Sequence, residues 1–167
     1  MNVSDQSGLS ACARTTLSAA LLLLLDGTAA AATIVVNNSG ASSVAGKCTL
    51  IDAVAAVNQA TAVNGCNAGD GADDLIDLTS FRQPTTITFK SPQDPSAPKV
   101  GLVNLPATSA LALSKPVTLR GALNAQGQPL VTLQRSTITT VAVPEFRIIG
   151  TTADIAIDGL TISGGYL

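Results

Sequence analysis

From residue 86 to its end the sequence is a series of short β-prone segments separated by turn residues, and this series constrains the fold most. Most of these segments alternate apolar residues with small or polar ones, so each would bury one face. Only residues 49–60 have a helical period, so no second helix is available to cross between the strands of a βαβ unit. The segments are 86–89, 100–105, 111–113, 117–119, 130–133, 147–149, 155–157 and 160–162.

The last two segments distinguish among the all-β architectures that remain, which are a sandwich, a barrel and a solenoid of stacked β-turns. Residues 155–157 and 160–162 are separated only by Asp158 and Gly159. Sandwich strands usually have about five or six residues and are joined by hairpin turns. Strands of three residues with such a short corner fit a solenoid, in which the chain turns and continues around one axis.

The composition agrees with stacked strands and excludes several functions. Apolar residues make up 46% of the chain but aromatic residues only 2%, so Ala, Val, Leu and Ile would fill a narrow interior. Charged residues make up only 12% of the chain, which disfavours a coiled coil. The net charge of −2 disfavours nucleic acid and anionic membranes as partners. The chain has no His, so it cannot build a Ser-His-Asp or Cys-His catalytic system by itself.

Residues 1–32 have the order of features of a secretory signal peptide. Arg14 precedes a Leu-rich run over 17–25, and Ala29 to Ala32 provide small residues for cleavage, which we expect before Thr33. The apolar run is too short for a membrane span, which needs about 20 residues. A buried helix of the mature fold is the other alternative. The sequence therefore predicts a secreted or cell-surface protein without a transmembrane helix in its mature chain.

Residues 33–80 are expected to form an N-terminal capping segment with one helix at about 49–60, and residues 81–167 the first coils of the solenoid. Leu50, Val54 and Val57 fall on one face of that helix, and Thr49 with Asp52 resembles a capping box. The end of a solenoid exposes an apolar cross-section that must be covered. We expect the helix to cover it.

The cysteines are expected to support this helix. Removal of the leader removes Cys12 and leaves Cys48 and Cys66, which most simply form a disulfide in an exported chain, with two free buried thiols as the alternative. A helix over 49–60 would be about 18 Å long, and residues 61–66 can span roughly that distance when extended. The chain can therefore return from the end of the helix to its start.

The stretch from Cys48 to Ala53 resembles the Cys-Ser/Thr-Leu-Arg-Glu-Ala motif of the CSLREA domain, found near the N-terminus of secreted bacterial β-helix (pectin-lyase-like) proteins. Cys48, Thr49, Leu50 and Ala53 match the motif, whereas Ile51 and Asp52 replace Arg and Glu. The similarity continues through 55–58, 71–76, 86–89 and 159–165. It implies a right-handed parallel β-helix with an extracellular or outer-membrane destination. Family members usually continue for many more coils, so we expect this chain to be truncated.

One acidic cluster is dense enough to suggest a metal site. Residues 68–76, with Asp70, Asp73 and Asp74, fit most of a calcium-binding nonapeptide repeat. That repeat binds calcium between stacked copies, and the sequence contains one copy. Calcium is therefore the one cofactor that the sequence suggests. The alternative is that these residues form a solvated turn leading into a strand at 75–78.

No catalytic residue is predicted. Arg120, Arg135, Arg147, Asp154 and Asp158 could line a groove between coils, but isolated outward side chains of a solenoid would look the same. The resemblance implies no single activity, because β-helices occur in adhesins, autotransporter passengers and polysaccharide lyases alike. We therefore expect a non-catalytic exported scaffold, adhesin-like, with cell-surface glycans or proteins as partners. The alternative is the N-terminal part of a carbohydrate-active lyase or hydrolase whose active site lies beyond Leu167.

Overall fold

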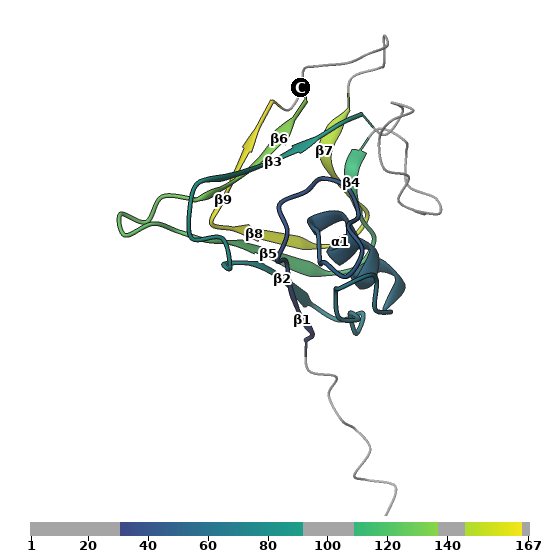
Figure 1. Ribbon diagram of the computed structural model, residues 1–167. Coiled ribbons are helices and arrows are strands. Elements are labelled where there is room, and N and C mark those ends of the chain that lie inside the picture. Colours follow the sequence, from purple (N-terminus) through teal and green to yellow (C-terminus); the bar gives the residue numbers. More distant parts are fainter. Residues whose placement is uncertain (1–30, 92–108, 137–145, 165–167) are drawn as a thin grey trace, which may run out of the picture.

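The computed structural model of the protein describes residues 31–91, 109–136 and 146–164 (Figure 1). Residues 1–30 of the predicted leader and the β-prone segment at 100–105 lie outside the described residues. The described chain is mainly β, with strands in three parallel sheets and one short helix. Each predicted β segment other than 100–105 overlaps a strand. The elements are β1 Thr33–Val35, α1 Leu50–Gln59, β2 Asp74–Leu78, β3 Thr85–Phe89, β4 Ser109–Leu113, β5 Val117–Gly121, β6 Val131–Arg135, β7 Arg147–Thr151, β8 Ile155–Asp158 and β9 Leu160–Ser163.

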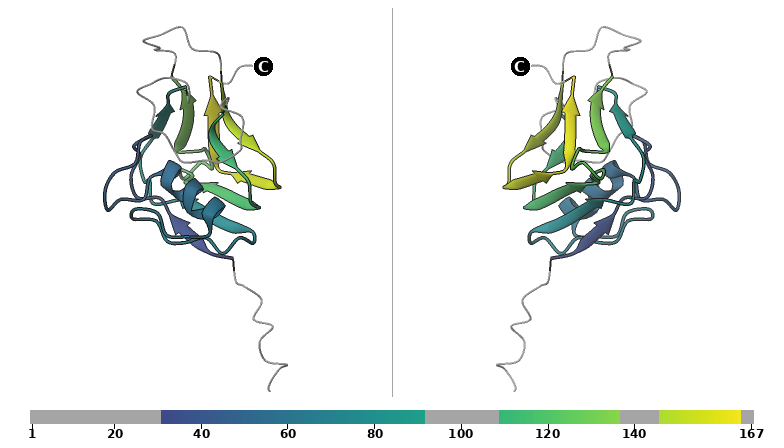
Figure 2. Two further views of the ribbon diagram at one scale, coloured as in Figure 1. Left: turned by 90° about the vertical axis from the view of Figure 1, so that its right-hand side faces the viewer. Right: turned by 90° about the vertical axis from the view of Figure 1, so that its left-hand side faces the viewer.

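Consecutive strands from β2 onward belong to different sheets. The sheet orders are β1-β2-β5-β8, β3-β6-β9 and β4-β7, and every pairing within them is parallel. The chain therefore visits the three sheets in a fixed cyclic order. We call β2-β3-β4 the first circuit and β5-β6-β7 the second, and β8-β9 begin a third. Figure 1 shows the three sheets as the sides of a triangle, and Figure 2, seen from the side, shows the circuits stacked one upon another.

The alternation of residue types places one row of side chains inside the triangle. On the first sheet this row is Ile34, Ile76, Leu119 and Ile157, which are directly aligned from strand to strand. On the second sheet Ile87, Leu133 and Ile162 are aligned in the same way. Because successive side chains of a strand point to opposite faces, the residues between them point outward. Identical spacing in every strand thus builds one continuous aliphatic core.

Helix α1 begins and ends with defined caps. The Thr49 hydroxyl accepts a hydrogen bond from the backbone N–H of Asp52, as in a capping box, and donates one to the Asp52 carboxylate in place of the backbone N–H that a capping box would use. At the other end Ala60 takes a left-handed conformation with φ 50°, and its N–H bonds back to the last turn of the helix. A left-handed residue at this position ends the helix because the next carbonyls no longer align with the axis.

The helix is covered more completely than its predicted amphipathic pattern suggests. All eight residues from Leu50 to Val57 are buried, not only those of one face. One side contacts β2 and β4 of the first circuit, and the loops on either side of the helix cover the other side. Alanines on the helix allow these loops to approach closely, and a Cβ added at Gly69 would lie 2.8 Å from the Val57 Cα. The cap is therefore a packed layer, not a helix lying on the surface.

The predicted boundary near residue 80 does not separate cap from stack. β1 and β2 pair in the same sheet as β5 and β8, so residues 33–80 contribute two strands to the stack besides the helix. Within the described ranges, no helix is long and apolar enough to cross a membrane.

Candidate functional site

The cap is the most densely connected polar region. A disulfide joins Cys48 and Cys66, the pairing that the sequence predicts, with their Cα atoms 4.5 Å apart. Both cysteines are buried, and the Cys48 N–H donates to the Asn37 side chain at 2.9 Å. The bridge holds the residue before the helix against the loop that follows it. Its place inside the packed layer indicates a structural role.

Asp52 is the buried carboxylate of the cap, with 2% of its surface exposed. It accepts hydrogen bonds from the hydroxyls of Ser43 (2.5 Å) and Thr49 (2.7 Å) and from the Asn64 amide (2.8 Å). These donors satisfy the charge that burial would otherwise penalise. The sequence pattern revealed Thr49 but not Ser43 or Asn64, because both come from loops with no periodic signal. All three side chains donate to the one carboxylate of Asp52, so this cluster ties the loops on both sides of the helix to its first turn.

A second polar connection, not predicted from the sequence, fastens the helix to the stack. The Asn58 side chain donates to the Ala112 carbonyl at 2.7 Å and accepts from both the N–H and the hydroxyl of Ser114 at 2.9 Å. These partners lie at and just after the end of β4. A polar residue near the end of a mainly apolar helix was the only sequence signal of this contact.

The acidic residues predicted as calcium ligands have three different roles. Asp74 is fully buried, and its Oδ1 accepts from the backbone N–H groups of Ala32 (3.2 Å) and Asp70 (3.1 Å). The Asp70 side chain accepts from the N–H of Ala72 in its own turn, and Asp73 is exposed with φ 45°. In the part of the chain that the structure describes, no group of three or more His, Cys, Asp or Glu could hold a metal ion. Calcium binding stays a prediction.

The basic residues considered for a groove do not come together. Arg120, Arg135 and Arg147 lie on β5, β6 and β7, which belong to three different sheets. The Arg135 guanidinium lies 6.0 Å from the centroid of the Phe146 ring, a distance compatible with a cation–π contact. Asp154 lies in the turn before β8. The three arginines are therefore distributed around the triangle, and only Arg120 lies beside one of the aspartates, Asp158.

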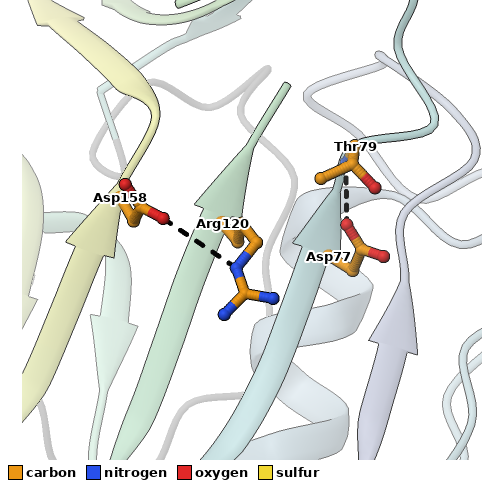
Figure 3. A network of polar contacts seen from close by, with 4 residues as sticks. All are labelled: Asp77, Thr79, Arg120 and Asp158. Atoms are coloured by element: carbon orange, nitrogen blue, oxygen red, sulfur yellow. Dashed lines mark hydrogen bonds and ion pairs between the residues drawn. The ribbon is translucent and has the colours of Figure 1, made fainter. Parts of the chain in front are cut away.

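One outward row on the first sheet is charged. Asp77, Arg120 and Asp158 are aligned across β2, β5 and β8. The Arg120 Nε lies 3.9 Å from the Asp158 carboxylate, whereas Asp77 accepts from the N–H of Thr79 at 2.8 Å (Figure 3). Both members of the ion pair are exposed, so solvent screens their attraction. This row has the features of a solvated surface.

The outward face of the second sheet carries no acidic or basic residue at its aligned central positions. Thr86, Thr132 and Thr161 form one row, and Thr88, Gln134 and Ser163 form the next. Adjacent strands lie about 4.8 Å apart, so the face presents closely spaced hydroxyl and amide groups. We call these six residues the hydroxyl face. Such groups both donate and accept hydrogen bonds, as sugar hydroxyls do.

Comparisons of this chain with protein-family models, with curated proteins and with solved structures find no match.

Proposed function

We propose that the chain is the exported N-terminal end of a right-handed parallel β-helix that acts as a non-catalytic scaffold, secreted or displayed at the cell surface. The observation that carries this proposal is the cyclic passage of the chain through three parallel sheets, with a packed helical cap on the first circuit. Stacked parallel strands without crossover helices are the architecture of a solenoid. The right hand follows the strong preference of connections between parallel strands in one sheet.

The resemblance of the Cys48–Ala53 stretch to the CSLREA motif supports the same proposal. Four of the six positions match, and the disulfide and the Thr49–Asp52 cap involve residues of this stretch. A motif whose residues hold a cap together would be expected at the start of a long solenoid. The proposed destination outside the cell agrees with the leader at 1–32 and with a disulfide, which needs an oxidising compartment.

The hydroxyl face supports glycans as the partners of this scaffold. Thr86, Thr88, Gln134 and Thr161 are exposed, Thr132 and Ser163 are half-buried, and none of the six carries a charge. Neutral groups that both donate and accept can pair with sugar hydroxyls, and a rigid surface lowers the entropy cost of binding them. The parallel pairing of β6 with β3 on one side and β9 on the other would provide that rigidity at the centre of the face.

The experiment has two parts. The full gene, with its leader, is expressed in a Gram-negative host, and the protein is sought in the outer membrane and medium; its retention in the cytoplasm would contradict the proposal. The purified protein is then tested on an array of bacterial and host glycans. Thr132→Glu should weaken binding about tenfold or more, because a carboxylate replaces a hydroxyl in the centre of the hydroxyl face.

Thr118→Glu is the matched control. Thr118 is also half-buried and outward-facing, and its strand β5 also belongs to the second circuit and has a neighbour on each side, but it lies on the first sheet. It should bind glycans as the unchanged protein does. Equal loss in both variants, or no glycan binding by the unchanged protein, would overturn the assignment of this face.

A further inference from the structure

We infer that the leader is cleaved between Ala31 and Ala32, one residue before the site expected from the sequence, and that the new α-ammonium group of Ala32 forms an ion pair with buried Asp74. This inference rests on the proposed export of the chain. It assigns a processing site and a reason for its position. The observation that carries it is a buried carboxylate whose oxygen lies 3.2 Å from the backbone nitrogen of Ala32.

Asp74 lacks the partner that a buried carboxylate requires. Its exposed fraction is 0%, and its Oδ2 has no hydrogen-bond partner in the described parts of the chain. The ion pair of Arg120 with Asp158 lies on the outward face of the first sheet, opposite to the buried face that holds Asp74. Buried Asp52 accepts hydrogen bonds on both carboxylate oxygens, whereas a buried oxygen without any donor, such as Asp74 Oδ2, carries a desolvation penalty. The present donors to Asp74 are two neutral N–H groups, from Ala32 and Asp70.

The surroundings of Asp74 leave little room for any other cation. A Cβ added at Gly69 would lie 2.5 Å from Asp74 Oδ2 and 2.8 Å from the Val57 Cα, so helix α1 and this loop close over the carboxylate. A Lys or Arg side chain would have to displace that packing. An α-ammonium group needs no additional space, because it replaces an amide nitrogen that is already in place.

Small residues permit cleavage on either side of Ala32, and the structure distinguishes the two sites. Ala29 and Ala31 satisfy the small-residue rule for cleavage before Ala32, and Ala30 and Ala32 satisfy it for cleavage before Thr33. Cleavage before Thr33 would remove the Ala32 carbonyl, which accepts from the Leu75 N–H at 2.8 Å, together with the N–H that binds Asp74.

Cleavage before Ala32 keeps the carbonyl bond and converts the amide nitrogen into a cation. The Ala32 nitrogen then carries three protons instead of one, and the negative charge of Asp74 is neutralised where it is buried. Hydrolysis of the Ala31–Ala32 bond consumes one water and leaves the Ala31 carboxylate on the departing leader. The folded cap is thus more stable after removal of the leader than before it.

The first test identifies the new terminus. The exported protein is purified from cells expressing the full gene, and its intact mass and N-terminal peptide are measured. Ala32 as the first residue is the expected result, and Thr33 as the first residue would overturn the inference. A protein retained with its leader would contradict the proposed export, and the second test still examines the ion pair.

The second test uses the full-length chain with the recognition sequence of a specific protease in place of residues 26–31, so that cleavage of the folded protein releases Ala32. Cleavage should lower the unfolding equilibrium constant about tenfold or more in the unchanged protein, as expected for a close buried ion pair. In Asp74→Asn it should change this constant by less than about twofold, because the pair cannot form.

Asp77→Asn is the matched control, because Asp77 lies on the same strand and is half-buried, and its side chain accepts from the Thr79 N–H, away from Asp74. It should show the same tenfold response to cleavage as the unchanged protein. An equal response of the Asp74 variant and the unchanged protein, or no response of either, would overturn the ion pair.

Discussion

The two ends of the strand stack contain the same kind of residue in the same position but in different surroundings. Ile34 and Ile76, at the capped end of the first sheet, are fully buried. Ile157 continues their row on β8 and is 41% exposed, and Ile162, which continues the row of Ile87 and Leu133 on β9, is 45% exposed. The strand pattern is the same at both ends, but only the first has α1 and its loops packed on it (Figure 2).

This difference shows that the direction in which a side chain points and its burial have separate causes. Alternation along a strand decides which side chains point into the triangle, and the same alternation operates in every circuit. Burial depends on whether another layer lies over that side chain. At β8 and β9 the described chain provides a neighbour on one side only. An apolar row that continues to an uncovered strand is a surface suited to a further circuit.

The largest difference is expected when an isoleucine of the same inward row is replaced by alanine at each end of the stack. Ile76→Ala should destabilise the protein by about 3–4 kcal/mol, because the cavity forms between two paired strands. Ile157→Ala should cost less than about 1 kcal/mol, since solvent fills the space. Denaturant unfolding of both variants measures this difference. Equal losses would mean that Ile157 is covered in solution and that the two ends are alike.

Removing the disulfide tests how much of the stability of the capped end depends on the covalent link. Replacing both Cys48 and Cys66 by Ala should lower the free energy of unfolding by about 3 kcal/mol, the loop-closure entropy of a bridge with a sequence separation of 18. Thermal unfolding with and without a reductant provides the measurement. Cys12→Ala is the control, because Cys12 belongs to the predicted leader; a similar loss there would contradict the structural role of the pair.

Asn58 connects the cap to the stack without a covalent bond. Asn58→Ala should cost about 1–3 kcal/mol, because the Ala112 carbonyl and the Ser114 N–H lose their partner. The adjacent exposed Gln59→Ala should change stability by less than about 0.5 kcal/mol. Hydrogen exchange of the helix amides shows where the loss occurs. Protection that falls equally in both variants would exclude this role for Asn58.

The smallest effect is expected at Ala60, the residue that ends helix α1. Ala60 is exposed and has φ 50°, a conformation that costs an alanine about 1 kcal/mol. Ala60→Gly should therefore stabilise the protein by about 0.5–1 kcal/mol, and Thr61→Gly should not. Denaturant midpoints at equal slope are the measurement. Destabilisation by Ala60→Gly would show that the alanine methyl makes a contact that outweighs its backbone strain.

Much of the local structure could be predicted from the sequence. The helix at 49–60 differs by one residue at each end from α1, because its period and its Thr49–Asp52 cap are local signals. Seven of the predicted β segments overlap strands, from 86–89 to 160–162, since alternation is also a local property. The exclusion of βαβ units and the expectation of parallel stacking followed from the shortness of the segments and the lack of helices.

The tertiary structure decided which of these elements meet. Only the folded chain distributes Arg120, Arg135 and Arg147 over three sheets, brings Ser43 and Asn64 to Asp52, and places the carboxylate of Asp74 beside Ala32. These contacts join loops and strands that are up to 42 residues apart, and no local propensity encodes them. The sequence by itself determined the period of each segment and which of its side chains point to the same face, because both depend on neighbouring residues. The pairing of the strands fixed the register, and the register decided which charges are aligned, as Asp77, Arg120 and Asp158 are.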